Sequence, residues 1–321
     1  MSDISADLKA VAKLLDSAES IGIVGHVGPD GDALGSMIGL ARSARLAGKK
    51  AVASFDEPFV VSEEMSFLDA SVLVRPEGFP RDLDVAVAVD TSVRSRVGSL
   101  AGAMEKAHRL VVLDHHISDG SWGDVVAIDA TAAATTELVH ELLNLLDWPI
   151  DKEVATALYT GLVTDTGRFQ YSSVSSRTHS IASELLAHGV ETDVVGQKLF
   201  EEASFGYFHV VSRVLGRAVL DVDHALVWSI MEPADLEAAG IGYHETDGLM
   251  DLVRMARGTE VACLLKRKSP GVIKGSLRSR GRVDVAAIAR SFDGGGHHNA
   301  AGFTSASDPS EIVEQIVAHL S

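Results

Sequence analysis

The chain has 321 residues, which is enough to form two domains of ordinary size. Hydrophobic residues make up 46% of it and charged residues 23%, so a chain that is disordered throughout is excluded. The single cysteine, Cys263, excludes an intramolecular disulfide and a cysteine-based zinc site, and it favours a cytoplasmic location. No apolar run reaches the roughly 18 residues of a transmembrane helix, and the acidic N-terminus does not resemble a secretory signal.

The net charge of −17 argues against a protein that binds duplex DNA, because contacts to phosphates need lysine and arginine. The charge is unevenly distributed along the chain. Residues 254–290 contain ten basic and two acidic residues and carry +8, which leaves −25 for the remainder. Two interpretations fit this contrast: solvated surfaces of opposite sign, or an acidic metal site and a cationic site for a small anion.

The first half of the chain alternates short apolar runs with helical patterns. Strands are predicted at residues 21–26, 51–55, 71–74, 85–90, 110–116 and 125–129, and helices at 30–46, 135–146, 152–165 and 176–190. Strands that are apolar almost throughout and are separated by helices indicate a parallel sheet buried on both faces. The predicted fold class is therefore α/β, with a parallel-sheet, Rossmann-like domain at residues 1–190.

A second, smaller α/β domain is predicted at residues 209–321, after a linker region at 191–208 that has no clear period. Its predicted strands lie at 213–231, 260–268 and 272–279, and its helices at 247–256, 283–292 and 308–320. Asp308 is expected to cap the last helix, with Glu311 completing a capping box.

Polar residues follow the first predicted strand, where His26, Asp30 and Asp32 lie in a turn rich in glycine and proline. Ligands of parallel α/β sheets bind at the carboxyl ends of the strands, so these side chains are candidates for a cation site. The alternative is that the two aspartates only cap the following helix.

Three further segments place acids or histidines at the ends of apolar elements. Asp90 ends one strand, Asp114, His115 and His116 end another, and Asp165 ends a helix shortly before Arg168. Each has a simpler explanation by itself, as a turn residue or a helix end that stops at Gly167. If these segments meet at one edge of the sheet, their carboxylates lie close together, and cations are needed to offset the repulsion between them. The oxygen-rich donor set suits Mn²⁺ or Mg²⁺. Two ions about 3.5–4 Å apart would share a bridging carboxylate.

Two glycine-containing segments occur in the second half of the chain. Residues 275–281 lie within the basic stretch 254–290, and residues 294–303 follow it closely. Glycines let backbone amides approach an anion closely, and arginine or histidine can add charge-assisted hydrogen bonds to phosphate. The alternative is a pair of tight turns without a ligand.

These motifs resemble those of the DHH phosphoesterase superfamily. Residues 26–36 look like its first motif, Asp90-Thr91-Ser92 like its second, Asp114-His115-His116 like the motif that names it, and 164–169 like its fourth. Residues 294–303 are similar to the signature of the DHH-associated C-terminal domain. The short two-domain form is similar to NrnA-type oligoribonucleases. The resemblance implies a smaller C-terminal domain that binds substrate, with the active site in the cleft between the domains.

The resemblance also implies roles for individual residues. One metal ion would be held by His26, Asp30 and Asp90, and a second by Asp32, Asp90, His115 and Asp165, with Asp90 as the bridge. Asp114 would orient its neighbours, and His116 would contact the scissile phosphate or assist proton transfer. The substrate-binding candidates are Arg168, Arg278, Ser279, Gly294, Gly295, Gly296 and His297.

The function implied is that of a phosphoesterase with two divalent metal ions, Mn²⁺ first and Mg²⁺ or Co²⁺ as alternatives. A metal-bridging hydroxide would attack phosphorus in short oligoribonucleotides, pApA or cyclic di-AMP, and would convert pAp to AMP. The alternatives are an exopolyphosphatase or pyrophosphatase and a non-catalytic nucleotide sensor. No duplex DNA or membrane partner is expected. A homodimer is expected, although Leu138, Leu142, Leu145 and Leu146, which could face a second copy, are explained equally well by burial within the monomer.

Overall fold

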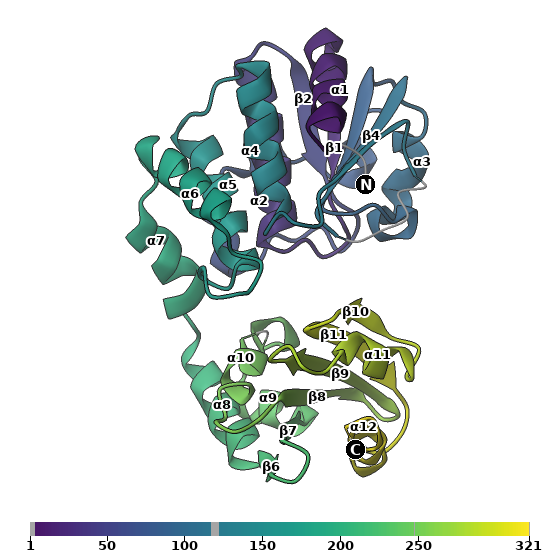
Figure 1. The fold of residues 1–321 in the computed structure, drawn as a ribbon, viewed down its shortest axis with the longest axis vertical. Coiled ribbons are helices and arrows are strands. Elements are labelled where there is room, and N and C mark those ends of the chain that lie inside the picture. The colour runs from purple at the N-terminus through teal and green to yellow at the C-terminus, as the bar shows by residue number, and fades with distance from the viewer. Residues whose placement is uncertain (1–3, 117–121, 247, 321) are drawn as a thin grey trace. The chain divides into compact units, whose positions relative to one another are not determined.

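The computed structural model describes residues 4–116, 122–246 and 248–320 (Figure 1). The chain divides into two compact units, Met1–Glu202 and Ala203–Ser321, called here the N-terminal and C-terminal units. Both contain helices packed on a sheet, so the predicted α/β class is confirmed. The predicted linker region, 191–208, contains the short helix α7 (Thr192–Gly196), a π-helical turn (Gln197–Glu201) and the start of the next helix. None of the described helices is both long and apolar enough to span a membrane.

The described strands of the N-terminal unit form a parallel sheet in the order β2-β1-β3-β4-β5, as the apolar runs predict. Its strands are β1 (Ser20–Val24), β2 (Lys50–Ser54), β3 (Val85–Val89), β4 (Arg109–Asp114) and β5 (Val125–Ile128). Val24 pairs with Ala88, and Val89 pairs with Leu113. The carboxyl ends of β1, β3 and β4 therefore lie side by side.

Helices cover both faces of this sheet. They are α1 (Ile4–Ser17), α2 (Gly31–Leu46), α3 (Ala101–Met104), α4 (Thr135–Leu146), α5 (Lys152–Asp165) and α6 (Ser176–Ala187), with 3₁₀ turns at Glu63–Met65, Ala70–Val72, Pro76–Gly78 and Arg94–Leu100. One core joins α1, α2, α4, α5 and α6 to one sheet face, and a smaller core packs α3 and its neighbours on the other. Helices α2 and α5 approach so closely that a Cβ atom at Gly35 would lie 2.3 Å from the Ala157 carbonyl oxygen.

The prediction of a strand at residues 71–74 was wrong. This stretch begins as the 3₁₀ turn Ala70–Val72, and beside β2 it forms an isolated bridge between Ala53 and Leu73 instead of a described strand. The Asp69 side chain accepts a hydrogen bond from the backbone N–H of Ser71, which stabilises the turn. A local cap of this kind competes with strand pairing.

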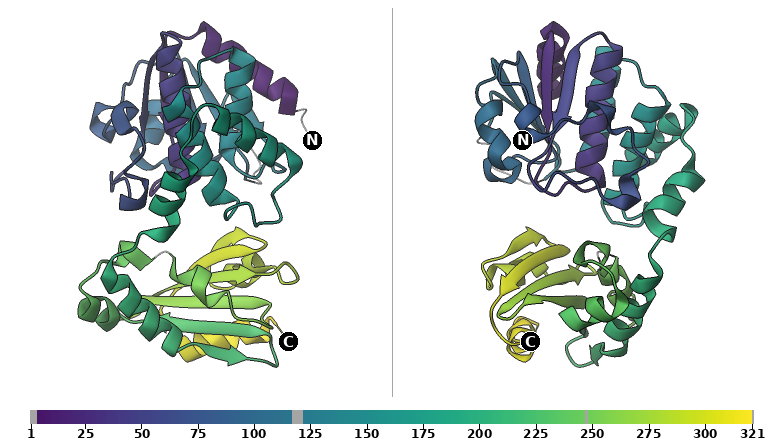
Figure 2. Two further views of the ribbon diagram at one scale, coloured as in Figure 1. Left: turned by 90° about the vertical axis from the view of Figure 1, so that its left-hand side faces the viewer. Right: turned by 180° about the vertical axis from the view of Figure 1, so that it is seen from behind.

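The C-terminal unit has a mixed sheet in the order β10-β11-β9-β8-β7-β6 (Figure 2). Its strands are β6 (Val219–Asp221), β7 (Leu226–Met231), β8 (Val261–Ser269), β9 (Val272–Ser279), β10 (Gly295–His297) and β11 (Ala300–Ser305), and only β7 and β8 among the described pairs run parallel. Its helices are α8 (Phe205–Gly216), α9 (Pro233–Ala239), α10 (Leu249–Val253), α11 (Val285–Arg290) and α12 (Pro309–Ala318), with a 3₁₀ turn at Tyr243–Thr246. Helices α11 and α12 pack on one face of the sheet, and α8 to α10 pack on the other.

Two details of this unit correct the predictions. Residues 213–216 belong to α8 rather than to a strand, because Val210 and Val214 lie one turn apart and are both buried. Asp308 does occupy the N-cap position of α12, but its side chain makes no capping hydrogen bond, so the predicted capping box does not form.

The helix considered for a dimer contact, α4, lies largely inside the N-terminal unit. Leu138 and Leu142 are fully buried in its core, whereas Leu145 is 48% exposed. Two of the four leucines are therefore explained by folding within one chain, and the homodimer stays a prediction.

Candidate metal centre

The side chains predicted to bind metal gather at the carboxyl edge of the parallel sheet. Among the described residues, three overlapping groups place their donor atoms within 4.8 Å of one another. The groups are His26 with Asp30 and Asp90, Asp32 with His115 and Asp165, and Asp90 with His115 and His116. The structure thus brings together every residue predicted to bind metal, from the ends of β1, β3, β4 and α5 and from the start of α2.

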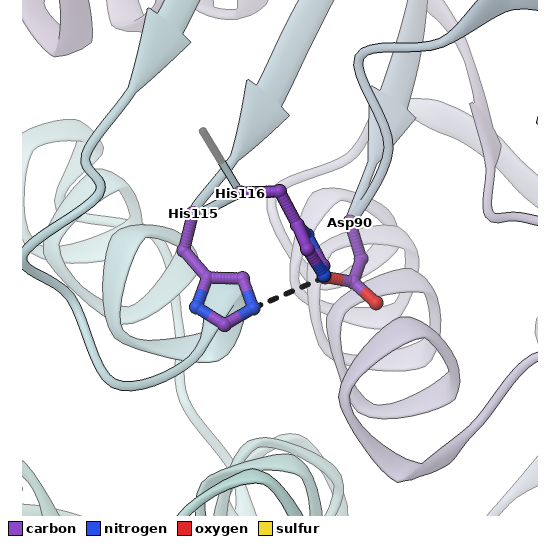
Figure 3. A group of neighbouring side chains, drawn as sticks. All are labelled: Asp90, His115 and His116. Carbon is purple, nitrogen blue, oxygen red and sulfur yellow. Dashed lines mark ion pairs between the residues drawn. The ribbon is translucent and has the colours of Figure 1, made fainter. Parts of the chain in front are cut away.

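Asp90 connects two of these groups. It directly follows β3, is 1% exposed and has a φ of 58°. One carboxylate oxygen, Oδ2, lies 3.4 Å from His26 Nε2, and the other, Oδ1, lies 3.6 Å from His115 Nε2. Figure 3 shows Asp90 turned toward the two histidines that follow β4. A carboxylate that points one oxygen into each of two donor groups has the arrangement of a bridging ligand.

Backbone carbonyls orient two of the histidine rings. Val27 O lies 3.0 Å from His26 Nδ1, and Ala132 O lies 3.3 Å from His115 Nδ1. A carbonyl can only accept, so Nδ1 carries a hydrogen and Nε2 is the nitrogen that faces the carboxylates. Hydrogen bonds to the far nitrogen are the usual support for histidines that bind metal.

His115 Nε2 is a buried donor atom without a hydrogen-bond partner among the described residues. It lies 3.2 Å from Asp165 Oδ2 and 3.8 Å from Asp32 Oδ2. A buried nitrogen lone pair that faces carboxylate oxygens and bonds to none of them is suited to a cation. The residues present therefore fit a metal ion.

The electrostatics of the carboxylates support the same conclusion. Burial, followed by the charges of Asp90 and other neighbouring aspartates, raises the pKa of Asp32 well above its usual value. Burial and the charges of Asp30 and Asp90 do the same for Asp165. Burial alone would lower the pKa of His26, but Asp30 and Asp90 outweigh it and raise that pKa to about 10. Negative charge is crowded here, and bound cations would relieve the repulsion.

Asp114 and His116 form a hydrogen-bonded pair at the edge of this cluster, in which His116 also belongs to the donor group of Asp90 and His115. The Asp114 carboxylate is fully buried, and its Oδ1 accepts hydrogen bonds from the backbone N–H of His116 at 3.1 Å and from His116 Nδ1 at 2.8 Å. Burial would raise the pKa of Asp114, but its contacts with His116 lower it. The His116 ring is therefore held in one orientation by a charged neighbour.

Asp30 makes two kinds of contact, and its role as a metal ligand stays a prediction. It caps α2, since its Oδ1 accepts hydrogen bonds from the backbone N–H groups of Asp32 and Ala33, and it also belongs to the donor group of His26. Asp32 does not cap its own helix. Its carboxylate accepts the backbone N–H groups of Thr135 and Thr136 at the start of α4. Sequence reasoning missed these threonines, and only their place at the start of a predicted helix could have signalled them.

Arg168 lies in a turn directly after α5. Gly167, Arg168 and Phe169 all have positive φ values, 54°, 62° and 61°. The Arg168 guanidinium carbon lies 4.0 Å from the centre of the Phe200 ring, in the π-helical turn. Left-handed backbone at consecutive residues stores strain, which is typical of functional sites. Phe200 was not predicted, because no sequence motif connects it to this turn.

In the C-terminal unit, Gly294, Gly295 and Gly296 follow α11, and the last two of them belong to strand β10. Gly296 has a φ of 144°, and a Cβ atom there would lie 2.4 Å from the Ala300 carbonyl oxygen, so only glycine suits the position. The side chain of His297 lies outside the described part of the structure, and its role stays a prediction. Gly294 helps to line a cavity of about 420 Å³ together with Lys274, Phe292, Asp293, Gly302, Phe303 and Thr304.

The other two candidates of this unit lie on β9. Arg278 pairs in register with Ala300 of β11, and its guanidinium donates to the carbonyl oxygen of Leu277. Ser279 is 7% exposed, and its hydroxyl donates to Glu260 at 3.2 Å. Ser279 thus already has a structural partner, and its contact with substrate stays a prediction.

Comparison with known proteins shows which family this chain resembles in sequence. Residues 20–162 match the model of the DHH family, N-terminal domain, and residues 237–321 match the DHHA1 domain. The chain is 33% identical over 303 residues to the bifunctional oligoribonuclease and PAP phosphatase NrnA of Thermus thermophilus, an alignment that covers 92% of this chain and 88% of that protein. The chain belongs to the DHH family. The resemblance seen in the sequence motifs is thereby confirmed.

Other DHH-family relatives extend the comparison. The chain is 28% identical to the cyclic-di-AMP phosphodiesterase GdpP of Geobacillus thermodenitrificans over 90% of its length, but it spans only 45% of that protein. Its fold matches the crystal structure of an exopolyphosphatase-related protein from Bacteroides fragilis with a TM-score of 0.91, at 24% identity and with 100% and 97% of the two chains covered. That structural likeness shows the fold alone.

Proposed function

We propose that this DHH-family chain binds two divalent metal ions at the edge of the parallel sheet. His26, Asp30 and Asp90 would hold one ion, and Asp32, Asp90, His115 and Asp165 would hold the other. The observation that carries the proposal is the division of the Asp90 carboxylate between His26 and His115. A mixed set of carboxylate oxygens and imidazole nitrogens supports Mn²⁺ before Mg²⁺ or Co²⁺.

The reaction proposed is hydrolysis of phosphate esters in short oligoribonucleotides and of pAp. It is supported by this donor set and by the likeness to the NrnA of Thermus thermophilus over most of both chains. A pair of divalent cations, when bound, lowers the pKa of water and polarises phosphoryl oxygens. The likeness to GdpP makes cyclic di-AMP and pApA further candidates.

The chain's own residues would position the substrate and move protons. Asp114 holds His116 by its Nδ1, and Nε2 of the ring would contact the scissile phosphate or give a proton to the leaving oxygen. Arg168, fixed over Phe200, would donate to a phosphate oxygen. In the C-terminal unit, Arg278 and the backbone of Gly294–Gly296 would bind the nucleotide, with His297 and Ser279 as further candidates.

Product analysis tests this function. Protein purified with Mn²⁺ would be offered pApA, a 5-mer RNA, pAp and cyclic di-AMP in parallel, with and without EDTA, and the products separated by chromatography. We expect EDTA-sensitive release of AMP from pApA and pAp and of mononucleotides from the RNA. Turnover of none of the four by protein shown to contain metal would overturn the proposal. A parallel assay would offer pyrophosphate and polyphosphate, and release of phosphate from these alone would favour the exopolyphosphatase or pyrophosphatase alternative.

A further inference from the structure

The start of helix α4 is capped by a side chain that lies far away in the sequence. Its own N-cap residue, Ala134, has no side chain that can accept a hydrogen bond. The fully buried carboxylate of Asp32, on α2, takes that place: Oδ2 accepts from Thr135 N at 2.6 Å and Oδ1 accepts from Thr136 N at 2.9 Å. The first turn of α4 and the proposed metal ligand Asp32 are therefore fixed to each other.

The side chain of Thr135 makes a different contact from its backbone. Its hydroxyl donates a 3.0 Å hydrogen bond to Oδ1 of Asp90. Thr135 is fully buried and Asp90 is 1% exposed, so water does not compete for this bond. One residue thus contacts two proposed ligands, Asp32 through its N–H and Asp90 through its hydroxyl.

The bonded oxygen, Oδ1, is the one that faces His115, whereas Oδ2 faces His26. A carboxylate turns readily about its last side-chain bond, and turning would take each oxygen out of its donor group. A hydrogen bond to one oxygen stops that rotation and leaves a second lone pair on the same oxygen for a cation. The backbone of Asp90, held at a φ of 58° by a 3.0 Å bond from its N–H to Leu113 O, fixes the other end of the side chain.

We propose that Thr135 is a positioning residue whose hydroxyl sets the rotation of the Asp90 carboxylate, so that each oxygen faces one of the two donor groups. The inference rests on the proposed two-metal function. It assigns to the first turn of α4 a part in positioning a metal ligand, which two threonines at the start of an apolar helix do not reveal from sequence.

The test uses three variants of the full chain. Thr135→Val removes the hydroxyl at nearly constant shape, and Thr135→Ser keeps it. Thr136→Val is the matched control, because the Thr136 hydroxyl is also buried but has no hydrogen-bond partner among the described residues. All three variants keep the backbone N–H groups that cap onto Asp32.

Binding of Mn²⁺ alone to metal-free protein would be measured by calorimetry, and the Mn²⁺ electron paramagnetic resonance spectrum would be recorded. We expect wild type to bind two ions and to show the exchange-coupled signal of a bridged pair. Thr135→Val should lower the affinity about 10–100-fold, as is usual for residues that support metal ligands, and should weaken the coupled signal. Thr135→Ser and Thr136→Val should behave like wild type.

The outcomes separate the two proposals. If wild type binds no pair of Mn²⁺ ions, the proposed function fails. If wild type binds the pair and Thr135→Val binds it equally well with an unchanged coupled signal, the two-metal function stands and the positioning role of Thr135 is overturned. Equal losses in Thr135→Val and Thr136→Val would also overturn it, because the effect would then come from the helix end and not from the hydroxyl.

Discussion

Charged side chains have different partners in two regions of the molecule. One region is the acidic edge of the N-terminal unit, where the candidate metal ligands lie, and the other is the basic segment of the C-terminal unit, residues 254–290. At the edge, the carboxylates of Asp32, Asp90 and Asp165 lie close together, and among the described residues their ion-pair partners are histidines rather than lysine or arginine. In the basic segment, cations have fixed partners: Arg267 pairs with Glu232, Arg282 with Glu260 and Arg290 with Asp284.

The remaining cations of that segment are also partly used. Arg280 donates to the backbone carbonyls of Thr259, Arg254 and Ala256, and the buried Lys266 donates to Thr246. The +8 counted from the sequence therefore overstates the charge available to a ligand. The comparison teaches that buried carboxylates crowded together with only histidines beside them point to a cation site, whereas a basic stretch of sequence offers a ligand less charge than its residue count suggests.

The largest effect is expected at Asp90. Asp90→Asn keeps the shape of the side chain but removes the charge shared by the two donor groups. We expect activity to fall by more than the roughly 100-fold that a supporting residue costs, together with loss of bound metal. Hydrolysis rates and metal content measured on the same sample check this. Normal activity with normal metal content would remove Asp90 from the centre.

Metal removal should distinguish the two units. A ligand present at 100 times its dissociation constant stabilises a fold by about 2.7 kcal/mol. We expect Mn²⁺ to slow hydrogen exchange in the N-terminal unit, above all at the starts of α2 and α4, and EDTA to reverse this. Exchange in β7 and β8 of the C-terminal unit serves as the internal control. Equal protection of both units would show that the metal effect is not local.

Close packing behind the acidic edge gives the next effect. A Cβ atom at Gly161, on α5, would lie 2.6 Å from Thr136 Cγ2 and 2.9 Å from Asp32 Cα. Gly161→Ala should therefore lower the free energy of unfolding by about 1–3 kcal/mol and weaken metal binding. Gly102→Ala, on α3, has open space around the new methyl group and is the control. Denaturant unfolding of both variants checks the difference.

The smallest effects are expected on KM, and they should differ between two arginines of the basic segment, Arg278 and Arg282. Arg278→Ala should raise KM about tenfold, in keeping with the loss of one hydrogen bond to a charged group. Arg282→Ala breaks an ion pair whose arginine is 79% exposed, while Glu260 keeps its bonds from Ser279 and from the Arg282 backbone. Its KM and melting temperature should stay near wild type. A larger KM effect for Arg282→Ala than for Arg278→Ala would reverse this assignment.

The sequence predicts the parallel sheet and the proximity of the candidate metal ligands, because buried parallel strands are apolar throughout and their carboxyl ends converge. His26, Asp90 and His115 could be placed together from strand ends alone. The contacts of Thr135 and Phe200 could not, because they depend on where α4 and the π-helical turn pack against residues far away in the chain. The 3₁₀ turn Ala70–Val72 was missed because a local cap outweighs the strand propensity of its residues.

The central claim is that Asp90 lies between two metal ions. Crystals grown with Mn²⁺, with diffraction measured on both sides of the manganese absorption edge, test it most directly. The account predicts two anomalous peaks about 3.5–4 Å apart, one beside His26 and Asp30 and one beside His115 and Asp165, each in contact with Asp90. A single peak, or a pair in which Asp90 contacts only one ion, would contradict it.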